Sequence, residues 1–143
     1  MPWKLSPIES MRVLIADDQK SVGTTLAALV VQCQHEVVEV VGSGLDAIQA
    51  YARHRPDVVL MDYFMPRLNG ATACRNILAR DPAARIILIS GTDLTKEIAE
   101  SGAVAILAKP VRLDQLYTAL YDLGGSRSEK IPDGPPGAPP PQA

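Results

Sequence analysis

The stretch that decides the fold spans residues 57–70 and reads DVVLMDYFMPRLNG. Its first part, residues 58–61, consists of four apolar side chains, two of them β-branched. Such a run predicts a strand that is buried on both faces, as the strands of a parallel sheet are. The strand ends in a single acid, Asp62, and Pro66 disfavours a helix in the loop that follows. An isolated Asp in this place would most often only cap a turn, so its meaning depends on the other strands.

Apolar runs alternate with helical periodicities along the rest of the chain. The runs predict further strands at residues 13–16, 37–41, 86–89 and 104–107. The periodicities predict helices at residues 19–33, from about Gly44, at 70–80 and at 94–101, and a last helix from about Leu113. Strand–helix alternation with apolar strands indicates an α/β fold, a doubly wound five-stranded parallel sheet in a three-layer (βα)5 sandwich. Right-handed crossovers leave few topologies, and we expect the flavodoxin-like strand order 2-1-3-4-5.

The helical periodicity also predicts which side chains face the core. Cys74, Ile77 and Leu78 are expected to face inward. The apolar residues Ile48, Tyr51 and Ala52 share one face of the second helix, and Leu113, Leu116, Tyr117 and Leu120 mark the last helix. Cys33 and Cys74 have no metal-ligand spacing and are expected to be buried or half-buried thiols.

Composition bounds the domain organisation and the function classes. With 143 residues, 47% of them hydrophobic and 21% charged, the chain should form one globular domain. We expect a short lead at 1–10, the folded domain at 11–123 and a flexible tail at 124–143, where six of the 20 residues are Pro and four are Gly. The net charge of −2 gives no reason to expect nucleic acid as a partner. Neither a membrane helix nor a signal peptide is recognisable, so a cytoplasmic protein is predicted.

Polar side chains follow four of the predicted strands. Asp17 and Asp18 end the first, Asp62 the third, Ser90 the fourth and Lys109 the fifth. In the order 2-1-3-4-5 these ends share one edge of the sheet, and the three acids meet between the first and third strands. Crowded carboxylates repel each other, and a hard cation such as Mg²⁺ relieves that repulsion. An Asp facing the metal can be the nucleophile in phosphoryl transfer, with a lysine and a hydroxyl stabilising the phosphoryl charge.

The segments LIADD, DVVLMDYFMPRLNG, ILISG and LAKP, in this order, resemble the receiver domain of two-component response regulators, of the chemotaxis-regulator type. The resemblance covers roughly residues 11–123 and implies that Asp62 accepts phosphate from a sensor histidine kinase or a histidine phosphotransfer protein. It also implies that Asp17, Asp18, Asp62 and the backbone carbonyl of Phe64 hold Mg²⁺, and that Lys109 and Ser90 contact the phosphoryl group. Such a protein catalyses only its own phosphorylation and slow dephosphorylation, and it signals through contact with a downstream protein.

Three features depart from the family pattern. Ile106 stands where the family usually has the aromatic residue of its switch. The stretch from Ser90 to Lys109 is about one helical turn shorter than is usual in the family, so the helix within it should be short. Phe64, two residues after the acceptor, is bulky and apolar. Ile106 has no ring that could be buried or exposed. We therefore expect the conformational change of the switch to involve mainly Ser90, Gly91, Thr92 and the short helix.

Two other functions stay open at this point. Residues 42–47, GSGLDA, fit the glycine pattern of a dinucleotide site, with Gly42 and Gly44 as the phosphate-binding glycines, and Asp62 lies about 20 residues further on. The motif follows the second strand, however, and it leaves Ser90 and Lys109 unexplained. A pseudo-receiver that binds a partner without phosphorylation is the other alternative. A dehalogenase-type phosphotransferase is disfavoured, because the first strand ends in DDQ where that class has D-x-D.

Overall fold

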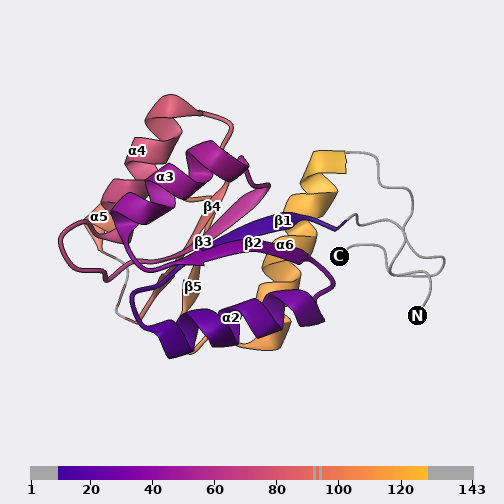
Figure 1. The fold of residues 1–143 in the computed structure, drawn as a ribbon. Coiled ribbons are helices and arrows are strands. Elements are labelled where there is room, and N and C mark those ends of the chain that lie inside the picture. The colour runs from indigo at the N-terminus through magenta and orange to yellow at the C-terminus, as the bar shows by residue number, and fades with distance from the viewer. Residues whose placement is uncertain (1–9, 92, 94, 129–143) are drawn as a thin grey trace.

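The computed structural model describes residues 10–91, 93 and 95–128, and Figure 1 shows their arrangement. The predictions for the lead at 1–9, for Thr92 and for the tail at 129–143 lie outside the described residues.

A five-stranded parallel sheet forms the centre of the molecule (Figure 1). Its strands are β1 (Arg12–Ala16), β2 (Glu36–Val41), β3 (Val58–Asp62), β4 (Ile86–Ser90) and β5 (Ala105–Ala108). They lie in the order β2-β1-β3-β4-β5, and every neighbouring pair is parallel. The predicted fold and strand order are therefore confirmed.

In the part of the chain that the structure describes, five helices cover the two faces of the sheet. They are α2 (Lys20–Gln32), α3 (Gly44–His54), α4 (Gly70–Arg80), α5 (Lys96–Ala99) and α6 (Leu113–Ser128). In Figure 1, α2 and α6 lie on one face, and α3, α4 and α5 lie on the other. Side-chain caps fix where three of them begin, since the side chains of Ser43, Asn69 and Thr95 each accept a hydrogen bond from a backbone N–H in the first turn.

Successive side chains of the central strands enter two different cores. In β1, Leu14 packs on the side of α3 and α4, whereas Val13 and Ile15 pack on the side of α2 and α6. All residues of β3 and β4 are buried, including the polar ones at their ends. Burial on both faces is the reason that these strands read as unbroken apolar runs.

The edge strand β5 is less buried than expected. Its residues alternate between half-buried and exposed, and Ile106 is 41% exposed. The helix before it, α5, has four residues, as the shortened sequence between Ser90 and Lys109 predicted. A helix of one turn covers little of the neighbouring strand, and this leaves one face of β5 open to solvent.

Three apolar residues that the periodicity groups with buried ones are exposed. Ala52 lies on the outer side of α3, where Ala47 and Ala50 are buried. Leu113 and Tyr117 are 42% and 44% exposed, while Leu116 and Leu120 are buried. In each case the outer residue is one or three positions from a buried one, so the apolar stripe is narrower than the periodicity suggested. Both cysteines are buried, as predicted.

The last helix is longer than the composition predicted. We expected the flexible tail to begin at Gly124, but α6 continues to Ser128. Glycine lowers helix stability by about 1 kcal/mol without preventing helical φ and ψ angles, whereas proline removes a backbone donor. The first proline after the domain is Pro132, beyond the end of this helix.

Within the described ranges, no helix has the length and apolar character that spanning a membrane requires.

Candidate functional site

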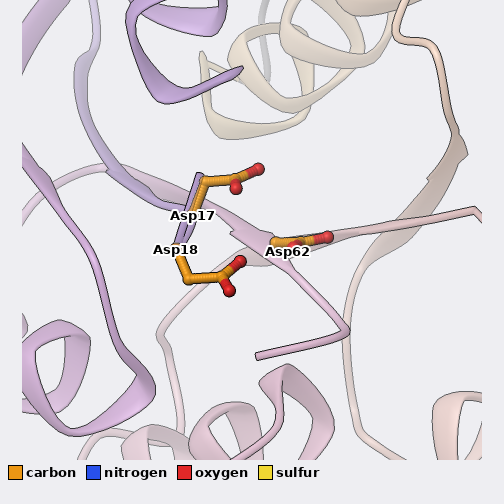
Figure 2. A group of neighbouring side chains, drawn as sticks. All are labelled: Asp17, Asp18 and Asp62. Carbon is orange, nitrogen blue, oxygen red and sulfur yellow. The ribbon is translucent and has the colours of Figure 1, made fainter. Parts of the chain in front are cut away.

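Three acids meet where β1 and β3 end. Ala16 pairs with Met61 in the parallel ladder, so Asp17 and Asp62, the next residues, leave neighbouring strands at the same level. Figure 2 shows the side chains of Asp17, Asp18 and Asp62 pointing to the same side. One carboxylate oxygen of each lies within 4.8 Å of the others. Asp17 and Asp62 are buried and Asp18 is exposed, so the group forms an acidic site with one solvent-facing carboxylate.

Lys109 reaches this acidic site from the far strand. Its backbone N–H donates to the Ser90 carbonyl at 3.0 Å, and its peptide bond to Pro110 is cis. Its ammonium Nζ lies 3.0 Å from Asp62 Oδ1 and 3.9 Å from Asp17 Oδ2. The side chain therefore crosses β4 to reach β3, as the predicted strand order required.

Burial governs the electrostatics of the two inner acids. It raises the pKa of both the Asp17 and the Asp62 carboxyl groups. For Asp62 the hydrogen bond from Lys109 acts in the opposite direction, and the nearby Asp17 adds to the rise. One Lys109 ammonium thus offsets only part of the cost of holding two acids in the interior.

A buried carboxylate oxygen without a hydrogen bond marks the place where a cation fits. Asp17 Oδ1 accepts a hydrogen bond from the Gln19 N–H at 2.8 Å. Asp17 Oδ2 is buried and has no hydrogen-bond partner within the described part of the chain. A buried carboxylate oxygen without a partner is costly, and a hard cation with oxygen ligands removes that cost. The donor set is therefore suited to Mg²⁺.

The remaining predicted residues surround the acidic site at different depths. Ser90 is buried at the end of β4, directly after Ile89, which pairs with Asp62. Gly91, the next residue, is exposed. Phe64 follows Asp62 by two residues, and its side chain is 78% exposed. Ile106 lies on β5, paired with Leu88 and away from the acids in the strand order.

Sequence reasoning missed a hydrogen-bond network beside the acidic site. The Tyr63 hydroxyl donates to Glu97 Oε1 at 2.8 Å, and Asn69 Nδ2 donates to Glu97 Oε2 at 3.1 Å. Tyr63 follows the acceptor candidate, Asn69 caps α4, and Glu97 belongs to α5. Because Tyr63 and Glu97 are 34 residues apart, no local pattern in the sequence signals their contact.

One of the two glycines of the rival motif, Gly44, has a structural explanation. A Cβ added to Gly44 would lie 2.7 Å from the Leu68 carbonyl oxygen, so the beginning of α3 and the β3–α4 loop approach as closely as glycine permits. Ser43 Oγ accepts from the Asp46 N–H at 3.0 Å and caps α3. Gly44 and Ser43 are therefore explained by packing and helix capping, without a dinucleotide.

Comparisons with known proteins agree with this geometry. The pattern of the family described as "Response regulator receiver domain" matches residues 13–121. The transcriptional regulatory protein PdtaR of Mycobacterium tuberculosis is 34% identical over 84% of this chain, which spans 59% of that relative's length. The chemotaxis protein CheY of Listeria monocytogenes is 31% identical over 77% of this chain and 95% of its own. Among solved structures, a chain of the CheX–CheY–BeF3–Mg²⁺ complex from Borrelia burgdorferi is 25% identical, with a TM-score of 0.77 over 84% of this chain and 97% of that one. The chain therefore belongs to the response regulator receiver domain family, whose members are phosphorylated signalling modules of two-component systems.

Proposed function

We propose that Asp62 is the phosphoacceptor of this receiver domain and that phosphorylation requires Mg²⁺. One observation carries the proposal: the Asp62 carboxylate lies within reach of two other carboxylates and 3.0 Å from the Lys109 ammonium. Asp17, Asp18, Asp62 and the backbone carbonyl of Phe64 would hold the metal. The Asp17 oxygen that has no hydrogen bond among the described residues supports this assignment, as does the presence of Mg²⁺ in the similar CheY complex.

Phosphoryl transfer to Asp62 is a single displacement. An Asp62 carboxylate oxygen attacks the phosphorus of a phosphohistidine, a P–O bond forms, the P–N bond breaks, and its electron pair stays on the imidazole nitrogen. Bound Mg²⁺ supplies positive charge that offsets the negative charges of the carboxylates and of the phosphoryl oxygens. Lys109 then exchanges its contact with Asp62 for one with a phosphoryl oxygen, and the Ser90 hydroxyl donates to another.

The proposed donor is a sensor histidine kinase or a histidine phosphotransfer protein, and the proposed output is contact with a downstream protein in the cytoplasm. The similar CheY chain in a complex with CheX supports an output of this kind. The domain catalyses its own phosphorylation and slow dephosphorylation and no other reaction. The low net charge gives no support to nucleic acid as a partner.

Intact mass measurement tests the acceptor directly. Wild type and Asp62→Asn are incubated with a small acyl phosphate and MgCl2, and then with MgCl2 replaced by a chelator. We expect wild type to gain one phosphoryl group only with Mg²⁺, and the variant to gain none. Equal uptake by Asp62→Asn would refute the assignment, and a wild type that takes up no phosphate would favour the pseudo-receiver alternative.

A further inference from the structure

We propose that Glu97 of α5 is a positioning residue for the metal site, acting through the loop between β3 and α4. This inference rests on the proposed function, because it concerns the loop that carries the Phe64 carbonyl. Glu97 touches neither the acids nor, in the proposed reaction, the phosphoryl group.

Glu97 binds both ends of that loop with one carboxylate. Oε1 accepts from the Tyr63 hydroxyl at 2.8 Å and Oε2 accepts from Asn69 Nδ2 at 3.1 Å. Tyr63 lies between Asp62 and Phe64 in the chain, and Asn69 is the residue before α4. A shift of Glu97 would therefore move the two ends of the loop on which the Phe64 carbonyl lies.

Backbone hydrogen bonds also hold the loop between β3 and α4, in addition to the side-chain bonds to Glu97. The Tyr63 N–H donates to the Ile89 carbonyl at 2.8 Å, and the Gly70 N–H donates to the Tyr63 carbonyl at 2.7 Å. The Leu68 N–H donates to the Pro66 carbonyl at 2.7 Å, around an Arg67 held at φ 69°. A turn of this kind with positive φ is strained for a non-glycine residue, so contacts at both ends are needed to hold it.

The short helix that carries Glu97 is itself fixed on its other side. Ile98, the next residue, is 1% exposed in the core shared with α4. The buried Ser101 hydroxyl donates to the Ile98 carbonyl at 2.7 Å, and the Cys74 thiol of α4 donates to the Ser101 carbonyl at 3.4 Å. The backbone that carries Glu97 is therefore fixed by its neighbours, although α5 is short. The contact of Glu97 with the loop does not depend on a long helix.

The ionisation states of Glu97 and Tyr63 at neutral pH favour the hydrogen bond between them. The hydrogen bonds from Tyr63 and Asn69 lower the pKa of Glu97, and the bond to Glu97 raises the pKa of Tyr63. The carboxylate is the acceptor and the phenol remains the donor, which makes the contact a charge-assisted hydrogen bond. Neutral variants of either partner therefore remove a defined interaction.

Mg²⁺ affinity is the measurement that isolates a positioning role. MgCl2 alone is titrated into the full chain while amide resonances are followed by NMR, for wild type, Glu97→Ala, Tyr63→Phe and the double variant. Glu100→Ala is the matched control, because Glu100 has the same charge on the same side of the sheet and its side chain makes no hydrogen bond or ion pair with any described residue. The thermal midpoint without Mg²⁺ is recorded for each protein.

We expect Glu97→Ala and Tyr63→Phe each to weaken Mg²⁺ binding by about three- to tenfold, at or below the low end of the effect of residues that directly orient metal ligands. The double variant should bind as weakly as Glu97→Ala alone, because both changes break the same contact. Glu100→Ala and the metal-free midpoints should stay close to wild type.

Three results would overturn the proposal. Unchanged affinity in Tyr63→Phe and Glu97→Ala would show that the loop keeps its position without the contact. An equal loss in Glu100→Ala would assign the effect to charge alone. A wild type that does not bind Mg²⁺ would refute the proposed function and this inference together, whereas a normal wild type with unaffected variants refutes only the inference.

Discussion

The centre of the sheet, β3 and β4, is more deeply buried than the edge strands β2 and β5. In β3 and β4 all residues are buried, and the helices α2, α3, α4 and α6 have 11 to 16 residues each. At one edge, β5 is half open and α5 has only four residues. The acids follow the central strands β1 and β3, and the side chain of Lys109, directly after β5, extends from the open edge to reach them. Burial thus fixes the positions of the chemical groups.

The largest expected effect lies in the acidic site itself. Asp17→Asn/Asp18→Asn should reduce Mg²⁺ binding below detection, because both substitutions remove the negative charge that a hard cation needs. The fold should survive, since the amide oxygen introduced at position 17 can still accept from the Gln19 N–H and the repulsion with Asp62 disappears. Calorimetric titration with MgCl2 and the metal-free thermal midpoint check this. Retained affinity, or a large fall in the midpoint, would contradict it.

Substitutions at Leu88 and Ile106 compare the buried centre of the sheet with its open edge, because the two residues are paired in the ladder between β4 and β5. Leu88 is 0% exposed and Ile106 is 41% exposed. Leu88→Ala should lower the free energy of unfolding by about 3–4 kcal/mol, within the range for buried leucines. Ile106→Ala should lower it by about 1 kcal/mol or less, as much of the side chain already meets water. Similar losses in urea denaturation would show that β5 is as well packed as β4.

Gly70 tests how tightly the site loop is closed. An added Cβ would meet the Asp62 carbonyl oxygen and would lie 2.9 Å from Tyr63 Cα, so the backbone would have to move. We expect Gly70→Ala to lower the free energy of unfolding by about 2–3 kcal/mol, as overpacking does. Gly42→Ala is the matched control, since its Cβ would have its nearest neighbour at 3.9 Å and should cost less than about 0.5 kcal/mol. Equal stability of both variants would contradict the close approach.

The smallest expected effect concerns Phe64, the exposed aromatic beside the acceptor. Hydrolysis of the aspartyl phosphate needs a water in line with the phosphorus, and a phenyl ring obstructs that water without binding it. Phe64→Asn or Phe64→Glu could hold the water with one hydrogen bond worth about 1 kcal/mol, so dephosphorylation should be about fivefold faster. The half-life of the phosphorylated protein measures this, with Phe64→Leu as the apolar control. Decay at the wild-type rate in the polar variants would refute the shielding role.

The sequence predicted burial more accurately in the central strands than at the open edge of the sheet. The runs VLIA, VVLM and IILI are apolar because both of their faces are covered, and that condition is visible in the sequence itself. Exposure of Leu113, Tyr117 and Ile106 depends on how far neighbouring helices extend over them, which no local window contains. The end of α6 was misplaced for a related reason, since glycine weakens a helix without terminating it.

The acidic site was predictable because each of its members ends a strand. Strand order alone brought Asp17, Asp18, Asp62 and Lys109 together, and the distances agree. The contact of Glu97 with Tyr63 and Asn69 was not predictable, because it depends on the direction of a one-turn helix. The positions of side chains at strand ends can be predicted from the topology of the sheet. The positions of side chains on short connecting helices depend on packing that the sequence does not reveal.

The direction of α6 has a practical consequence for attaching this protein to a surface. The Leu123 carbonyl accepts from Arg85 Nη1 at 2.9 Å, and Arg85 directly precedes β4. The described chain therefore begins and ends near the starting edge of the parallel strands (Figure 1), whereas the acids lie at the opposite edge. Five strand residues separate the two edges by about 17 Å. A biotin or a sensor chip coupled at residue 10 or at residue 128 would leave the acidic edge facing the solution, where a kinase could still approach Asp62.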